Sequence, residues 1–442
     1  MGKIYDMSRS RQFQDSFPKL YPELIEVDEN NKSLMVKNIT FVTTESCNLA
    51  CTYCYECHKT PKKMTTEVAK KAIDAIFDKE KMNGYVDDRY HKCVIIEFIG
   101  GEPFLNVEVM DFVCDYFLYK ATMLNHPWAK YHMFNVTTNG TLMHRPEVKK
   151  WIAKHREKLS ISITIDGDKE LHDSCRIFPD GSGSYDIVEK AVKEAIKDFN
   201  LRDTKVTFAP QNITKINTAI PHLFNLGLRG INANCVYEDV WTDEHPPIFF
   251  NELIKLADWM IENKVYEEGY CSIFDETIGH PIDKADNKNW CGGDGQMLAV
   301  SVDGRFFPCI RYMRYALSCP EREEIVIGNV DKGIDKKEDN KWLIRLSNIT
   351  RESQSTPECF NCSVGSGCSW CTAYNYDVFG TPNKRATFIC KMHKARVAAN
   401  YYYWNKLRKE LGDDEVKKFE MHLSEEDLKF VTGGNLDVFK GL

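Results

Sequence analysis

A regular alternation of short apolar runs and amphipathic stretches constrains the fold more than any other feature of the chain. The β-rich runs occupy residues 38–43, 94–99, 134–138, 160–165, 205–209 and 230–235. Stretches with apolar residues at helical spacing lie between and after them, at residues 65–78, 107–123, 146–155, 185–198, 212–226 and 249–262. Such repeats predict an α/β fold with a parallel sheet and right-handed crossovers. Because eight repeats close an ordinary barrel, six predict a partial (β/α)6 barrel with an open side.

The alternation ends near residue 265. The segment that follows is rich in Gly, Pro, Asn and Cys, and its Asp303-Gly304 pair between two alternating runs predicts a hairpin. A loop-rich segment with few aliphatic residues needs cross-links to hold its fold, and metal ions bound by cysteines would supply them. We therefore expect four parts, namely an N-terminal extension (1–36), the partial barrel (37–265), a loop-rich cysteine domain (266–390) and a C-terminal helical tail (391–442).

Composition excludes several classes of protein. The net charge of −7 over 442 residues gives no reason to expect nucleic acid as a partner. No run of about 18 apolar residues predicts a membrane span, and the start of the sequence lacks the apolar core of a signal peptide. We therefore expect a cytoplasmic protein with no membrane partner. In that reducing compartment the seventeen cysteines are expected to bind metal rather than to form disulfides.

Three of these cysteines, Cys47, Cys51 and Cys54, follow the first strand at the spacing C-x3-C-x2-C. Three thiolates on one compact loop can ligate three irons of a 4Fe–4S cluster and leave the fourth iron open for a substrate or cofactor. A zinc site is the alternative, because Cys57 adds a further cysteine at C-x2-C spacing, although a zinc site needs a fourth ligand at zinc-finger spacing.

A C-x3-C-x-aromatic-C run after the first strand of a βα barrel resembles the signature of the radical S-adenosylmethionine (SAM) superfamily. The resemblance implies that SAM binds the open iron and that the reduced cluster cleaves it to methionine and a 5′-deoxyadenosyl radical. It also implies an electron donor such as flavodoxin or ferredoxin. Tyr53 matches the aromatic residue that borders the adenine.

Further runs at the expected strand ends resemble the same superfamily. Gly100-Gly101-Glu102-Pro103 resembles its GGEP turn, in which glycines let backbone groups approach the methionine ammonium of SAM. Thr138-Asn139-Gly140-Thr141 resembles a TNGT run near the cofactor. Barrel enzymes place their chemistry at the carboxyl ends of the strands, which is where these runs lie.

The end of the fourth strand continues this resemblance. Thr164-Ile165-Asp166-Gly167, followed by His172-Asp173 and Arg176, resembles the S-I-D-G…H-D…R stretch of one subfamily, with Thr164 in place of serine. The resemblance implies that Thr164 contacts the ribose or the carboxylate of SAM. It implies that Arg176 contacts the carboxylate.

A second set of cysteines lies downstream. Its members are Cys291, Cys309, Cys359, Cys362, Cys368, Cys371 and Cys390. Their order and spacing, with Gly304 between the first two, resemble the SPASM domain, which carries auxiliary 4Fe–4S clusters in peptide- and protein-modifying radical SAM enzymes. One departure is that two residues, not three, separate Cys368 from Cys371. This departure puts the geometry at Cys371 in doubt.

The SPASM resemblance implies three 4Fe–4S clusters in the whole chain. A distal cluster would be held by Cys359, Cys362, Cys368 and Cys390, and a cluster nearer the active site by Cys291, Cys309 and Cys371. The nearer cluster then has three ligands. Either Cys271 or Cys319 completes it, or its fourth iron is open to a substrate thiolate. The other cysteines, Cys57, Cys93, Cys114, Cys175 and Cys235, are expected to be structural.

Arg311 bears on the reaction. Relatives that make formylglycine in sulfatases carry an aspartate base just after the cysteine aligned with Cys309, whereas this chain has Cys309-Ile310-Arg311-Tyr312. Formylglycine chemistry is therefore disfavoured. Arg311 is a candidate for binding a substrate carboxylate through two hydrogen bonds, with a structural ion pair as the alternative.

Together the resemblances imply an enzyme that matures a ribosomally synthesised, cysteine-rich precursor peptide. The expected product is an intramolecular crosslink, a Cys thioether first and a carbon–carbon bond second, and the CXXX-repeat peptide maturases are one group of this kind. Residues 1–36 are too short for the winged-helix domain with which many such enzymes bind a leader peptide, so we expect another surface or a separate protein to bind it. Two alternatives remain, namely a maturase of a folded protein of the sulfatase type and a non-catalytic, zinc-stapled binding protein.

Overall fold

The fold is taken from a computed structural model that describes residues 36–289, 291–412 and 415–442. The expected N-terminal extension, apart from Val36, lies outside the described residues. Within the described ranges no helix is long and apolar enough to cross a membrane.

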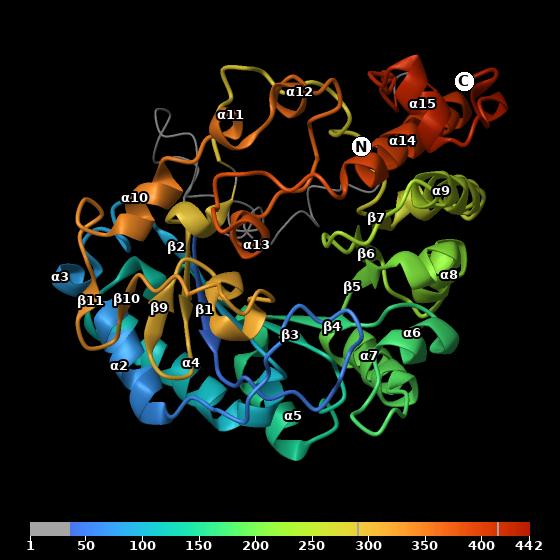
Figure 1. Cartoon of the computed structure of the whole chain (residues 1–442). Helices are drawn as coiled ribbons and strands as arrows, with labels where there is room; N and C mark the ends of the chain where they lie inside the picture. The colour runs from blue at the N-terminus through green and yellow to red at the C-terminus, as the bar shows by residue number, and fades with distance from the viewer. Residues whose placement is uncertain (1–35, 290, 413–414) are drawn as a thin grey trace.

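A single eleven-stranded sheet organises the molecule (Figure 1). Its strands are β1 Val36–Val42, β2 Cys93–Ile99, β3 His132–Thr138, β4 Leu159–Thr164, β5 Asp203–Phe208, β6 Gly230–Cys235, β7 Tyr270–Cys271, β8 Met297–Val300, β9 Arg305–Phe307, β10 Gly328–Asn329 and β11 Gly333–Ile334. Their spatial order is β11-β10-β9-β8-β1-β2-β3-β4-β5-β6-β7. Neighbours from β8 through β1 to β7 are parallel. The two outermost strands, β11 and β7, are not paired with each other, so the sheet is open rather than closed into a barrel.

The parallel strands are connected by helices, as the alternation of the sequence predicts. These helices are α2 Thr66–Ile76, α3 Lys79–Met82, α4 Val107–Met123, α5 Pro146–His155, α6 Lys169–Cys175, α7 Tyr185–Phe199, α8 Ile216–Asn225 and α9 His245–Glu262. β2 packs between the neighbouring strands and the helices, and five of its seven side chains are buried. This burial explains why its sequence is a nearly continuous apolar run. All six expected strands are confirmed within two residues at their ends.

The hairpin predicted at Asp303-Gly304 is confirmed as β8 and β9, and Gly304 has a φ of +83° in the turn. β8 also pairs with β1 in the parallel sense, which the sequence did not reveal. The sheet therefore runs across the boundary expected between residues 265 and 266. The division of the chain into four parts stays a prediction.

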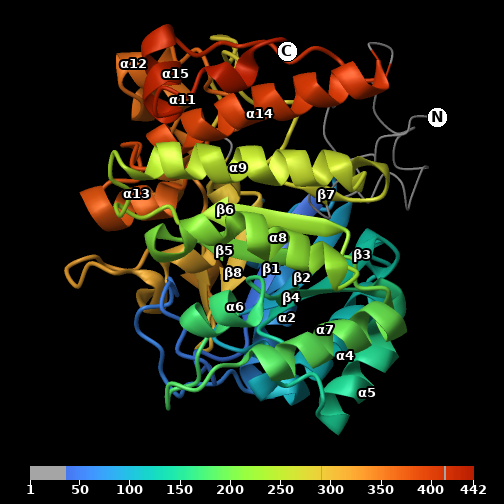
Figure 2. The same cartoon turned by 90° about the vertical axis from the view of Figure 1, so that its right-hand side faces the viewer.

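The rest of the chain lies above and beside the sheet. Its helices are α10 Lys341–Ser347, α11 Arg351–Gln354, α12 Pro357–Phe360, α13 Thr372–Phe379, α14 Cys390–Leu411 and α15 Glu425–Val431. The long α14 runs alongside α9, and α15 packs on α14 (Figure 2). Apolar side chains from the sheet, from its helices and from α14 belong to one continuous core.

Candidate active site

A cavity of about 270 Å³ lies at the carboxyl ends of β1 to β6. Most of the site residues predicted from the sequence line it, namely Cys47, Cys51, Tyr53, Cys54, Gly100, Gly101, Thr138, Asn139, Thr164, Arg176 and Arg311. A wider cleft of about 450 Å³ adjoins it and shares Cys54, Glu238 and Arg311 with it. The structure thus brings together residues that are up to 264 positions apart in the sequence (311 − 47).

Backbone hydrogen bonds fix the loop that carries the first three cysteines. The amides of Ala50 and Thr52 donate to the carbonyls of Ile177 and Cys175, at 2.8 and 2.9 Å. The amide of Leu49 donates to Sγ of Cys47 at 3.4 Å. None of the three cysteines is in a disulfide, and all three are partly buried. The loop therefore presents three free thiols from a defined backbone.

The two glycines after β2 have a packing role that the sequence did not indicate. A Cβ atom on Gly101 would lie 1.9 Å from the carbonyl oxygen of Ser46, and one on Gly100 would lie 2.5 Å from that of Thr44. Gly100 also has a φ of +140°, which side chains rarely tolerate. Only glycine lets this turn lie flush against the backbone that leads into Cys47.

Glu102 lies behind the cavity rather than in its wall. It is fully buried, and its Oε1 accepts from Oγ1 of Thr138 at 2.8 Å and from the amide of Phe104 at 3.1 Å. Its Oε2 accepts from the amide of Asn139 at 2.8 Å. Glu102 therefore ties the end of β2 to the end of β3. Pro103, the other member of the run outside the lining, begins the short 3-10 helix Pro103–Asn106.

The amide of Asn139 links β3 to the cysteine loop. Its Nδ2 donates to Oδ1 of Asn48 at 2.9 Å and lies 3.8 Å from Sγ of Cys47. Its Oδ1 accepts from the hydroxyl of Thr141 at 2.6 Å. Asn48 returns a hydrogen bond to that hydroxyl at 2.8 Å. The TNGT run thus supports Cys47 from the side.

Tyr53, Asp166 and Arg176 form a buried group on the opposite wall. The Tyr53 hydroxyl donates to Asp166, and Nη1 of Arg176 donates to the Tyr53 hydroxyl at 2.9 Å. Burial and the Asp166 carboxylate raise the pKa of Tyr53 well above its ordinary value, so the phenol stays protonated. Nε of Arg176 is buried and has no hydrogen-bond partner among the described residues. A buried, unpaired guanidinium N–H is suited to an anionic ligand.

Four charged residues that the sequence did not single out also line the cavity, namely Glu56, Lys59, Lys205 and Glu238. Lys205 reaches in from β5, where its Cα is paired with that of Thr164 on β4. Burial, together with the charge of Arg311, lowers the pKa of Lys205. Burial raises the pKa of Glu56 to about 7. Of these four residues, only Lys205 could have been picked out from the sequence, because a lysine in a predicted buried strand is unusual.

Arg311 bridges the cavity and the downstream cysteines. Its guanidinium stacks over the Tyr55 ring at 4.7 Å, and its Nη2 lies 3.6 Å from Oε1 of Glu238. The charges of Cys371 and Cys309 raise its pKa against the effect of burial, which places both sulfurs close by. Arg311 therefore makes an ion pair and also lines the cavity, and its binding of a substrate carboxylate stays a prediction.

The downstream cysteines fall into two groups. Besides burial, the charges of Cys291 and Cys371 raise the pKa of Cys309, so these three sulfurs are neighbours. In the same way, the pKa of Cys368 is raised by burial and by the charges of Cys359, Cys362 and Cys390, so these four sulfurs form the second group. The thiol of Cys319 donates to Glu321 at 3.0 Å, and Cys271 is buried near Arg396.

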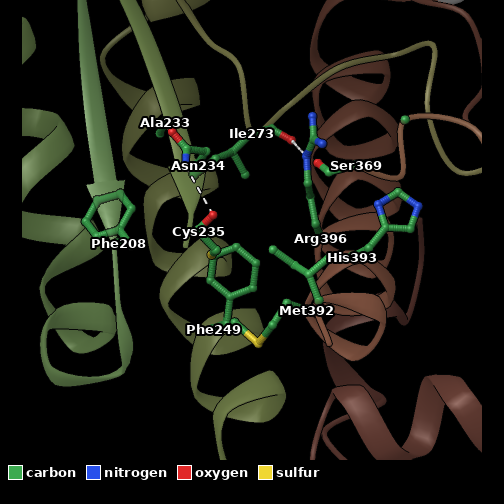
Figure 3. Close-up of a pocket in the computed structure, with 12 residues that line it drawn as sticks. Phe208, Ala233, Asn234, Cys235, Phe249, Ile273, Ser369, Met392, His393 and Arg396 are labelled. Atoms are coloured by element: carbon green, nitrogen blue, oxygen red, sulfur yellow. Dashed lines mark hydrogen bonds between the residues drawn. The ribbon is translucent and has the colours of Figure 1, made fainter. Parts of the chain in front are cut away.

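A smaller cavity of about 80 Å³ lies between β6, α9 and the start of α14 (Figure 3). Its walls are mostly apolar, and Nε of Arg396 at one end donates to the carbonyl of Ile273 at 2.8 Å. It shares Asn234 and Cys235 with the larger cavity. None of the residues predicted from the sequence lines it, so we do not include it in the candidate site.

Sequence comparisons agree with this geometry. A family model described as a 4Fe-4S single cluster domain matches residues 36–182. The subtilosin biosynthesis protein AlbA of Bacillus subtilis is 26% identical over 297 residues, which are 63% of this chain and 56% of AlbA. The radical SAM cyclopropyl synthase TigE of Paramaledivibacter caminithermalis is 24% identical over 298 residues, 62% of this chain and 57% of TigE. The chain thus spans less than two thirds of each of these relatives.

Solved structures with the same fold belong to two enzymes. The structure of anSMEcpe with bound AdoMet (SAM) superposes with a TM-score of 0.60, at 17% identity, over 85% of this chain and 99% of that chain. Streptococcus suis SuiB bound to its precursor peptide SuiA gives a TM-score of 0.52, at 13% identity, over 80% of this chain and 76% of that chain. The chain therefore shares its fold with anSMEcpe and SuiB.

Proposed function

We propose that this chain is a radical SAM enzyme that installs a crosslink, most readily a Cys thioether, in a ribosomally made precursor peptide. One observation carries the proposal. Three free cysteines line the same cavity as Arg176, and the cavity lies at the carboxyl ends of the parallel strands.

The cysteine geometry favours iron–sulfur clusters over single zinc ions. Four sulfurs around one zinc ion, with Zn–S bonds of about 2.3 Å, lie only about 3.8 Å apart. The described residues include all seventeen cysteines, and no group of three or more among them has its sulfurs within 4.8 Å of one another. Sulfurs that surround a larger cluster are farther apart, so Cys47, Cys51 and Cys54 fit a 4Fe–4S cluster with one iron left open.

The walls of the cavity fit SAM. When bound at the open iron of a reduced cluster, SAM supplies a 5′-deoxyadenosyl radical that abstracts hydrogen from the substrate. Arg176 would hold the carboxylate of SAM, and Thr164 would contact the ribose or the carboxylate. Tyr53, which Asp166 and Arg176 hold in place, would border the adenine. The turn at Gly100 and Gly101 would bring backbone groups close to the methionine ammonium.

Two auxiliary clusters would bring the total to three. Cys359, Cys362, Cys368 and Cys390 would ligate the distal one, and Cys291, Cys309 and Cys371 the nearer one. The Cys319 thiol donates to Glu321 and Cys271 lies near Arg396, so we infer that neither is the fourth ligand of the nearer cluster. A cysteine of the peptide would take that position, close to the cavity that Arg311 lines.

The wider cleft provides a route for a peptide. It leads into the cavity past Glu238 and Arg311, and Arg311 could bind a substrate carboxylate. AlbA, named for the biosynthesis of the bacteriocin subtilosin, and SuiB, solved with its precursor peptide SuiA, support a peptide substrate. An electron donor such as a flavodoxin or a ferredoxin would reduce the cluster, and the leader peptide would bind another surface or a separate protein.

The test is incubation of the reduced protein with SAM and candidate cysteine-rich precursor peptides. A thioether forms when the peptide loses one hydrogen atom to the deoxyadenosyl group, one electron to an acceptor and one proton from its thiol. Each crosslink therefore makes the peptide 2 Da lighter, and iodoacetamide should find one free thiol fewer. Abundant 5′-deoxyadenosine with peptides of unchanged mass would contradict the peptide assignment and leave radical SAM chemistry in place.

A second candidate is maturation of a folded protein. Its support is the extent of the superposition on anSMEcpe, which was also solved with a bound substrate-like peptide. Against it, Cys309 is followed by Ile310 and Arg311, whereas formylglycine-forming relatives carry an aspartate base just after the aligned cysteine. Oxidation of a cysteine in a sulfatase-type peptide to an aldehyde, detected by hydrazide labelling, would favour this candidate over a crosslinking maturase.

A further inference from the structure

Lys59 stands out among the charged residues of the cavity because it faces the first three cysteines from a segment that folds back over their loop. Its Nζ donates to the carbonyl of Leu49, inside that loop, at 3.4 Å. The Cys54 and Cys47 sulfurs raise the pKa of Lys59 against the lowering effect of burial. Lys59 also lines the same cavity as all three thiols.

The backbone on both sides of Lys59 is anchored. The amide of His58 donates to the carbonyl of Tyr315 at 3.1 Å, which ties the segment to the downstream region. The amide of Glu45 donates to the carbonyl of Lys62 at 3.0 Å, next to a β-bridge between Thr44 and Lys63. The ammonium is therefore placed by the fold and does not depend on a mobile side chain alone.

The other cation beside these cysteines is already engaged. Arg176 influences Cys51, but its Nη1 is bound to the Tyr53 hydroxyl. Carboxylates are also close, since Glu56 is buried next to Lys59 and Glu45 lies nearby. The positive charge of Lys59 thus acts on both Cys47 and Cys51.

We propose that Lys59 is a positioning residue that sets the reduction potential of the SAM-binding cluster through its fixed positive charge. Reduction adds one electron from a low-potential donor to a group whose thiolate ligands are already negative. A cation beside two of those ligands stabilises the reduced state more than the oxidised state. This inference rests on the proposed function, because it requires a cluster on Cys47, Cys51 and Cys54.

The test is a redox titration with dithionite, followed by electron paramagnetic resonance (EPR), on the anaerobically purified full chain. The SAM-binding cluster is recognised as the reduced signal that changes shape when SAM is added. Lys59→Met and Lys59→Gln should shift its midpoint to a more negative potential. We expect a tenfold less favourable reduction, which is about 59 mV for one electron. Lys59→Arg keeps the charge and should restore the wild-type value.

Lys63→Met is the matched control. Lys63 is an exposed lysine four residues farther along the same segment, and its Nζ donates to the carbonyl of Leu105 at 2.9 Å instead of facing the cysteines. Removing its charge should leave the midpoint unchanged. If a Lys59 variant binds less iron, the signal becomes smaller but its midpoint can still be read.

The possible failures are distinguishable. A protein with no reduced signal that responds to SAM would overturn the proposed function itself. A SAM-responsive signal whose midpoint is the same in wild type, Lys59→Met and Lys59→Gln would overturn only the role of Lys59. An equal shift in Lys59→Arg or in Lys63→Met would show that packing or net charge, and not the position of this cation, sets the potential.

Discussion

The two cysteine-bearing regions are built in opposite ways. Cys47, Cys51 and Cys54 stand on a loop that leaves β1 and is held by backbone hydrogen bonds to residues 175–177. The surrounding turns are locked by the buried carboxylate of Glu102 and by glycines that pack against the loop. Contacts within the protein therefore fix the conformation of this loop without a bound metal.

The segment 351–371 carries three of the distal cysteines with far less support. Val364 is its only buried apolar residue. Arg351 is the main anchor, since its buried guanidinium donates to the carbonyls of Asp286, Asp283 and Phe360 at 3.0, 3.0 and 2.8 Å. Both side-chain polar atoms of the buried Gln354 lack a hydrogen-bond partner within the described part of the chain. With the auxiliary cluster of the proposed function bound, such a segment would gain much of its stability from the metal.

Under the proposed function, the first site would be formed before metal binds, whereas the downstream site would be completed by the metal. In the first region, loss of a ligand should remove chemistry and leave the fold intact. In the downstream region, loss of the metal should loosen the fold itself.

The largest expected effect is that of Cys51→Ala on SAM cleavage. With two thiolates left, the cluster is not held, and formation of 5′-deoxyadenosine should fall by at least about a thousandfold. The circular dichroism spectrum should not change, because the neighbouring amides keep their hydrogen bonds. Cys57→Ala is the control, since that exposed thiol is expected to be structural. Normal deoxyadenosine formation by Cys51→Ala, measured by liquid chromatography, would refute the assignment.

Removal of iron by a chelator should affect the downstream region next most strongly. Backbone amides in 351–371 should exchange with deuterium about 10- to 100-fold faster, because the metal supplies most of the local stability. Amides of β2 should keep their protection. Hydrogen-exchange mass spectrometry of the loaded and stripped protein gives both values. An equal loss of protection in β2 would show that the two regions do not differ in this way.

Glu102→Gln tests the preformed site. The amide would present an N–H₂ group to at least one of the three donors that the carboxylate now satisfies. We expect the free energy of unfolding to fall by about 1–3 kcal/mol in a urea titration. Glu147→Gln, at an exposed glutamate on α5, should change it by less than about 0.5 kcal/mol. Equal changes in the free energy of unfolding for the two substitutions would contradict a supporting role for Glu102.

The smallest effect concerns pH. Burial lowers the pKa of His393 to about 4, and its Nε2 donates to the carbonyl of Val364 at 2.7 Å. Between about pH 6.5 and 4, His393 is protonated in the unfolded chain but stays neutral in the folded chain. The free energy of unfolding therefore falls as the pH falls. The loss from pH 7 to 5 should be about 2 kcal/mol. His393→Gln should flatten this part of the profile, and an unchanged slope would rule out a contribution from His393.

Local sequence pattern was sufficient for the parallel strands and for the residues at their carboxyl ends. Burial of both faces makes β2 a nearly continuous apolar run, and the motif residues follow the strands directly. The pairing of β8 with β1 joins segments about 260 residues apart, and no local pattern encodes such a pairing. For the same reason the shared sheet across residues 265 and 266 could not be foreseen.

At the site, residue types with a strong chemical preference were predictable and their supports were not. The cysteines and Arg176 were identified, and they line the cavity or group as expected. Glu102 lies in the run that resembles the GGEP turn, but the local sequence does not predict that its carboxylate accepts from Thr138, Asn139 and Phe104. Lys59 and Glu238 lie in loops where a single charge is common, so only their position in space marks them.

The most direct test of the account is the metal content of the anaerobically purified chain together with its EPR spectrum before and after SAM. We expect a brown protein with absorbance near 400 nm and about twelve irons, four for each of three clusters. Addition of SAM to the reduced protein should change one cluster signal and leave the others as they were. A colourless protein that contains zinc, or iron signals that are indifferent to SAM, would contradict the account.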